Sequence, residues 1–114
     1  MVTARRRNSG IFALSVVGHS GYADSGSDVV CAAVSALTQA LRVGLVDVLE
    51  LEDVKYFSDP NLPVMSLGWD GASLPAQRLA VTILLSLKSV EASYPGFVKV
   101  NEVFEEDTGD DENE

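Results

Sequence analysis

The sequence contains one cysteine and one histidine among 114 residues. A single cysteine cannot form a disulfide within the chain, and a lone thiol is unusual in a secreted protein, so we expect a reducing, cytoplasmic location. A zinc site needs about four ligands from Cys, His, Asp or Glu, which makes a metal centre built around this one pair improbable. We therefore expect neither a metal nor a cofactor.

Long apolar runs are scarce near the N-terminus. The run Ile11 to Val17 follows Arg5-Arg6-Arg7 and so mimics a secretory signal peptide, but it is only about seven residues long and no small-x-small cleavage site follows it. A helix that spans a bilayer needs ~20 apolar residues. We interpret the run as a β-strand and expect no membrane association.

Basic residues are few and acidic residues are unevenly spread. Eight Lys and Arg stand against seventeen Asp and Glu, and eight of the acidic residues lie from Glu102 onward, after every basic residue. The preceding part is therefore close to neutral and lacks the broad basic surface that nucleic-acid binding usually needs. Arg5-Arg6-Arg7 could contact RNA, but a solvated strand edge is the commoner role, and we expect no direct nucleic-acid partner.

Hydrophobic periodicity predicts the following order of elements along the chain. A weak strand at Val2 to Arg6 and a turn at Asn8-Ser9-Gly10 precede the strand Ile11 to Val17, in which Phe12, Leu14 and Val16 share one face. A helix from Asp28 follows, with Val30, Val34, Leu37, Leu41 and Leu45 as its buried stripe, and Gly44 marks its end or a point where it frays. Two short strands are expected at Val54 to Phe57 and Val64 to Leu67.

A second helix is predicted after these strands. Ser73 is its expected N-cap, Pro75 lies in its first turn, and Pro95-Gly96 stops it. Its predicted apolar stripe consists of Leu79, Ile83, Leu87, Val90 and Tyr94. Phe97 to Val100 could add a last short strand.

The predicted fold is α+β, a two-layer sandwich in which two helices cover one face of an antiparallel sheet of about four strands. At 114 residues the chain has room for one modest core, which we assign to residues 1–101. Residues 102–114 are acidic and lack an apolar period, and we expect a disordered tail there.

The cysteine and the histidine lie twelve positions apart, in a segment that contains Gly18-His19, Gly21 and Gly26, and then Cys31. With Ser27 or Asp28 as N-cap, Cys31 falls in the first turn of the helix, where unpaired N–H groups and the helix dipole favour a thiolate. A thiolate and an imidazole base are the minimal equipment of a cysteine hydrolase. The backbone N–H groups of Cys31 and Ala32 could then stabilise an oxyanion.

Each of these residues also has a plainer interpretation. Free cysteine is among the most buried residue types, so Cys31 could be one more small apolar helix residue. His19 could be an exposed loop residue, and Asp28 could cap the helix, orient the His19 ring or anchor the loop. Gly21 and Gly26 could make a mobile lid over the thiol or an ordinary solvated connection.

The segment Gly18-His19, a glycine-containing loop and Asp28-Val-Val-Cys-Ala-Ala-Val-Ser35 resembles the signature of the ribosomal-processing cysteine proteases. Further likeness lies in Val16 to His19, Ser35 to Gln39, Leu87 to Ser89 and Tyr94 to Val100, so that roughly residues 11–101 are covered. The basic first strand and the long acidic tail depart from the family pattern, and neither involves Cys31 or His19.

The resemblance implies a homodimeric cysteine protease in which Cys31 is the nucleophile, His19 the base and Asp28 a candidate third member. The family removes a short N-terminal extension from a large-subunit ribosomal protein, the twenty-seventh, which would be the substrate and partner here. Two rival functions use the same fold: a ribosome-associated binding module that cuts nothing, and a redox sensor based on the lone thiol.

Overall fold

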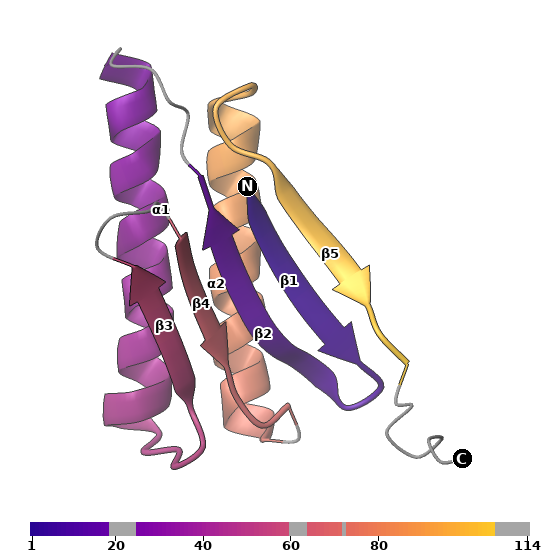
Figure 1. Cartoon of the computed structure of the whole chain (residues 1–114). Helices are drawn as coiled ribbons and strands as arrows, with labels where there is room; N and C mark the ends of the chain where they lie inside the picture. Colours follow the sequence, from indigo (N-terminus) through magenta and orange to yellow (C-terminus); the bar gives the residue numbers. More distant parts are fainter. Residues whose placement is uncertain (19–24, 60–63, 72, 107–114) are drawn as a thin grey trace.

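The computed structural model describes residues 1–18, 25–59, 64–71 and 73–106, and residues 25–28 by their backbone alone. The chain forms a sheet with two long helices (Figure 1). In order, the elements are β1 (Val2–Arg7), β2 (Gly10–Val17), α1 (Ser25–Val43), the π-helical turn η1 (Gly44–Val48), β3 (Lys55–Asp59), β4 (Val64–Gly68), α2 (Leu74–Ser93) and β5 (Val100–Phe104).

The five strands lie in the order β3-β4-β2-β1-β5. Neighbouring strands are antiparallel except for β1 and β5, which run parallel. The α+β sandwich is therefore confirmed, while the sheet is mixed because α2 returns the chain to the β1 edge in the direction of β1. Strands β2 and β3 are connected through α1 and run parallel to each other, with β4 between them. Strands β4 and β5 are connected through α2 and also run parallel, with β2 and β1 between them.

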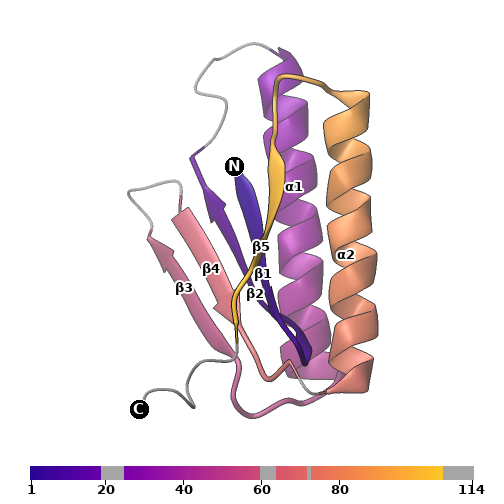
Figure 2. The ribbon, with the colours of Figure 1, turned by 90° about the vertical axis from the view of Figure 1, so that its right-hand side faces the viewer.

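The two crossovers explain why the helices share one face. One crossover starts from β2 and the other from β4, and these two strands are antiparallel. The crossovers also run towards opposite edges of the sheet. Both can therefore have the same handedness only if α1 and α2 lie on the same face. Crossovers between parallel strands are nearly always right-handed. Figure 2, a side view, shows both helices on one side of the sheet, and no helix of the described residues covers the other face.

A β-bulge changes the face on which Phe12 lies. The β1–β2 pairing shifts between Arg5, opposite Ala13, and Arg6, opposite Ile11, so Phe12 has no partner in β1. Ile11 and Leu14 are buried instead, and the predicted alternation of Phe12 with Leu14 is wrong. The extra residue inverts the alternation of side chains, and the Arg7 guanidinium lies over the Phe12 ring at 3.9 Å.

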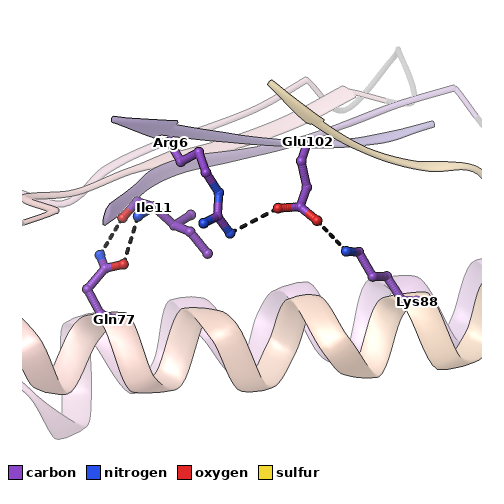
Figure 3. A network of polar contacts seen from close by, with 5 residues as sticks. All are labelled: Arg6, Ile11, Gln77, Lys88 and Glu102. Atoms are coloured by element: carbon purple, nitrogen blue, oxygen red, sulfur yellow. Dashed lines mark hydrogen bonds and ion pairs between the residues drawn. The ribbon is translucent and has the colours of Figure 1, made fainter. Parts of the chain in front are cut away.

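The side-chain amide of Gln77 in α2 binds the backbone of β2 close to the bulge. Its Oε1 accepts from the Ile11 N–H at 2.7 Å, and its Nε2 donates to the Ile11 carbonyl (Figure 3). A Cβ at Gly10 would lie 2.3 Å from the Gln77 Oε1, and Gly10 has a φ of +127°. Glycine at this position therefore gives α2 access to the strand backbone.

The predicted stripe of α1 is confirmed, since Val30, Val34, Leu41 and Leu45 are buried and Leu37 is half-buried. In α2 the core residues are Ile83 and Leu87, as predicted, together with Ala76, Ala80 and Leu84. Tyr94 was expected in this stripe, but it is the C-cap residue and is 38% exposed. Ser73 is the N-cap, as predicted, and accepts from the Ala76 N–H.

The last strand lies beyond its expected position. Residues 97–99 precede it, and β5 continues to Phe104, so Glu102 belongs to the sheet and not to a tail that begins at residue 102. The Glu105 N–H donates to the Arg6 carbonyl, which extends the ordered backbone past the predicted boundary at residue 101. Acidic composition suggested disorder, and pairing with β1 overrides that local tendency. Residues 107–114 lie outside the described residues.

Glutamates of the C-terminal segment pair with the arginines of β1. Glu102 contacts Arg6 at 2.9 Å and Lys88 of α2 (Figure 3), and Glu105 contacts Arg5 at 2.6 Å. The arginines therefore do not mark a solvated sheet edge, because β5 lies outside β1. The hydrogen bond from Lys88 and the positive charges of Lys88 and Arg6 hold the pKa of the Glu102 carboxyl below its ordinary value.

Within the described residues, one helical stretch, Val29–Val48, is long and apolar enough to cross a membrane by length and composition. Its residues Val30, Val34, Leu41 and Leu45 belong to the core. Transfer of this stretch to a bilayer would remove them from the core, so membrane insertion and this fold exclude each other.

We expect Glu102→Gln to lower the free energy of unfolding at pH 7 by about 0.5–1 kcal/mol, the usual scale for a partly exposed ion pair. A carboxyl with a depressed folded pKa stabilises the fold above its unfolded pKa, and this contribution is lost as pH falls through the folded value. The difference between variant and wild type should therefore shrink between pH 7 and an acidic pH below the ordinary pKa of glutamate. Urea unfolding at the two pH values measures it.

The control for this measurement is Glu52→Gln, because Glu52 is exposed and makes no ion pair within the described part of the chain. It should unfold like the wild type at both pH values. Equal changes in the free energy of unfolding for the two substitutions would show that Glu102 acts through the net charge of the protein and not through its ion pairs.

Candidate active site

A groove of about 800 Å³ lies between α1 and the sheet and contains the only cysteine. Its wall on α1 includes Cys31, Ser35 and Gln39. Residues of β2, β3 and β4 form the sheet side, and α2 with the segment before β5 closes one end. These remaining residues include Val16, Tyr56, Ser58, Val64, Met65, Glu91, Phe97, Val98 and Lys99.

The direction of Cys31 follows from the burial of its neighbour. Val30 is 2% exposed, and Val34, four residues later, lies on the same buried face. One residue advances an α-helix by about 100°, which brings Cys31 to the margin of the core. Its free thiol is half-buried and lines the groove. The interpretation of Cys31 as an ordinary core residue is therefore less favoured than a role in the groove.

The start of α1 differs from the prediction. The helix begins at Ser25, so Gly26 is its second residue and not part of a lid loop, and neither Ser27 nor Asp28 is the N-cap. Ser25-Gly26-Ser27-Asp28 offers several residues that suit a cap or a first turn, and the sequence does not choose among them. Cys31 consequently lies in the second turn.

The position of the helix start also bears on the expected oxyanion donors. In an α-helix the N–H of residue i donates to the carbonyl of residue i−4, so only the first four N–H groups lack a helical partner. With α1 beginning at Ser25, the N–H groups of Cys31 and Ala32 belong to the helical ladder. The role of these two groups as oxyanion donors stays a prediction, and it would require them to leave the helical ladder of this conformation.

Several predicted site residues lie outside the described residues: His19, Gly21 and the side chain of Asp28. Gly18, the last described residue before His19, lines the groove at the end of β2. Its φ of +76° lies in the left-handed region, which favours glycine, and a Cβ there would meet no atom within 4 Å. The requirement for glycine at position 18 is thus one of backbone conformation.

Sequence reasoning missed most of the groove. Tyr56 lies on β3, where the Arg42 guanidinium of α1 covers its ring at 4.1 Å. Thr38 is buried beside the groove, and its hydroxyl donates to the Val34 carbonyl at 3.0 Å. Glu91 and Lys99 close the far end. For the groove residues on β3 and β4, the sequence showed only that they belong to strands. The alternation of side chains along a strand does not tell which face of the sheet a helix will cover.

The described residues contain no group of three or more His, Cys, Asp and Glu side chains that could hold a metal ion. What the groove offers chemically is one thiol on a largely apolar wall. A thiol so placed can act as a nucleophile if a base removes its proton.

Comparison with known proteins gives the family. The family model of the cysteine protease Prp matches residues 1–99. The chain belongs to this family. The match includes both Gly18-His19 and the Cys31 segment, and it ends before β5, where the acidic residues begin. A comparison with curated protein sequences finds no match.

Solved structures of similar fold agree with the Prp assignment. The crystal structure of SMU.848 from Streptococcus mutans has a TM-score of 0.82 at 25% identity, over 91% of this chain and 93% of that one. The essential ribosomal processing protease Prp from S. aureus, in complex with a substrate peptide, has a TM-score of 0.75 at 23% identity, over 90% and 99%. The same S. aureus protease with a covalently linked product peptide has a TM-score of 0.73 at 24% identity, over 90% of this chain and 99% of that chain.

Proposed function

We propose that this Prp-family chain is a cytoplasmic cysteine endopeptidase that removes the short N-terminal extension of the twenty-seventh protein of the large ribosomal subunit. The observation that carries the proposal is the place of Cys31, whose thiol lines a groove of peptide size in a chain of this family. The S. aureus relative bound to a substrate peptide and to a covalently linked product peptide supports a peptide substrate and a covalent step.

The proposed chemistry has two steps. His19 removes the proton from the Cys31 thiol, and the sulfur attacks the scissile carbonyl to form an acyl-enzyme, while the same imidazole returns the proton to the leaving amine. Water then attacks the thioester with His19 as base, which releases the new carboxylate and restores the thiol. No metal or cofactor takes part in either step.

We expect Cys31→Ala to abolish cleavage of a peptide that spans the extension and the first residues of the ribosomal protein. His19→Ala should lower kcat by about 10²–10⁴-fold, the usual contribution of a general base. Mass spectrometry of the digest measures both. Ser35→Ala, on the same wall of the groove, is the matched control and should retain most activity.

The outcomes separate the rival functions. Cleavage by purified Cys31→Ala protein would contradict the enzyme assignment. Binding of the peptide without cleavage by the wild type would favour a binding module. An effect of peroxide on ribosome association, with no peptide cut under any condition, would favour the redox sensor.

Asp28 is proposed as the residue that orients His19. With α1 beginning at Ser25, Asp28 lies in the first turn of the helix and not at its N-cap position. A carboxylate that accepts from the imidazole would fix its tautomer and stabilise the imidazolium formed during attack. A negative charge in the first turn also interacts favourably with the helix dipole, which is a purely structural alternative.

Asp28→Asn separates these two roles. Orientation of His19 predicts a fall in kcat of at least tenfold with a shifted pH–rate profile, because the asparagine amide lacks the charge that stabilises the imidazolium. A dipole effect predicts a loss of about 0.3–1 kcal/mol in the free energy of unfolding and an unchanged kcat. Kinetics and urea unfolding of the same preparation measure both quantities. A kcat equal to that of the wild type at every pH would show that Asp28 takes no part in catalysis beside Cys31 and His19.

We further propose that the protein is a homodimer, as the family resemblance implies. In support, only 33% of the apolar stretch Val29–Val48 is buried within one chain, and Val29, Val43 and Val46 are exposed. Stable interfaces bury about 800 Å² on each partner.

Light scattering at micromolar concentration should therefore give twice the 12.1 kDa mass of one chain. Val43→Lys should shift the protein towards the single-chain mass, because a charge at the centre of an apolar interface is left unpaired. The exposed Val48→Lys, near the end of this stretch, serves as the control for added charge. A single-chain mass for the wild type over the whole concentration range would contradict the proposal.

A further inference from the structure

One charged residue of the groove, Glu91, has no hydrogen-bond or ion-pair partner among the described residues. Glu91 lies in the last turn of α2 and is half-buried, and its side chain lines the same groove as Cys31. It makes no hydrogen bond or ion pair with any described residue. Among the described residues that line the groove it is the one carboxylate, on a wall made largely of valine, methionine and aromatic side chains.

The position of Glu91 is also unfavourable for α2 itself. The C-terminal end of a helix carries a partial negative charge, which favours basic residues there and disfavours acidic ones. The last turn of α2 contains no basic residue. The carboxylate and the helix end therefore both place negative charge at this end of the groove, and no described cation forms an ion pair with Glu91.

Two cationic groups of the chain lie at the same groove without pairing with Glu91. The N-terminal ammonium of Met1 donates to the Val17 carbonyl at 2.8 Å. Lys99 lines the groove but is exposed, and no Lys99–Glu91 ion pair forms within 4 Å. Glu91 is thus an acid at an unfavourable helix position with no cationic partner in the described part of the chain, and such breaks with local rules are expected at functional sites.

We propose that Glu91 binds a cationic group of the peptide substrate, either a Lys or Arg side chain or the free α-amino group. The proposal rests on the proposed function, because it assigns this end of the groove to the same peptide that Cys31 cleaves. Glu91 would then be a specificity residue that sets how the peptide lies relative to the thiol.

Binding to the Cys31→Ala protein tests this separately from catalysis. The probe is the synthetic extension peptide with a C-terminal fluorophore, in four forms: unmodified, N-acetylated, with each Lys and Arg replaced by Gln, and with both changes. Fluorescence anisotropy gives Kd for each form. We expect Glu91→Gln to raise the Kd of the unmodified peptide about tenfold. It should leave unchanged the Kd of the peptide form that lacks the recognised cation. The form that is unaffected therefore shows whether Glu91 binds the α-amino group or a basic side chain.

Matched variants exclude a structural explanation. Glu52→Gln removes an exposed acid outside the groove and should leave the Kd of every peptide form unchanged. Glu91→Asp should recover part of the affinity, and Glu91→Gln should keep or raise the melting temperature, because it removes an acid from a helix C-terminus. With Cys31 intact, KM should rise about tenfold for Glu91→Gln while kcat changes less than twofold.

The proposal is wrong if the four peptide forms bind wild-type Glu91 protein equally, including the case in which none binds measurably. It is also wrong if Glu91→Gln weakens all four forms to the same extent, which would indicate a change in groove shape. Failure of the protease assignment would appear differently, as peptide binding that depends on Glu91 without cleavage by the protein with Cys31 intact.

Discussion

Burial of Val30 and Val34 determines the rotation of α1, and the site depends on that rotation. Because each residue turns the helix by about 100°, the thiol of Cys31 can lie at the margin of the core only while its neighbour fills the core. A rotation of one residue would bury the thiol, and the opposite rotation would move it away from the groove. The packing of these valines against the sheet thus determines where the Cys31 thiol lies.

The segment that lines the groove before β5 depends on ion pairs that link β5 to β1 and α2. Glu102 of β5 is held by Arg6 of β1 and Lys88 of α2, and the Val2 N–H donates to the Lys99 carbonyl. These contacts keep β5 beside β1. The segment that enters β5 carries Phe97 and Lys99, so it is positioned at the groove by the same contacts. Glu102 and Glu105, the first acidic residues of the C-terminal region, therefore belong to the fold.

Much of the architecture was visible in the sequence. The order of strands and helices, the stripe of α1 and the Ser73 cap depend on local periodicity and local hydrogen bonds, which a sequence displays directly. The face of Phe12, the helix start at Ser25 and the extent of β5 were not visible. The bulge depends on how two strands align, and β5 is stabilised by residues almost a hundred positions away.

The sequence by itself determined the family signature, the residue types available at positions 19 and 31, and the order of strands and helices. These properties follow from residue types and spacings within short segments. Only the tertiary structure decided which side chains share the groove with Cys31. Tyr56, Met65, Glu91 and Lys99 come from four separate segments, and they meet there because crossover direction and strand register, which are set by long-range packing, bring them to one side of α1.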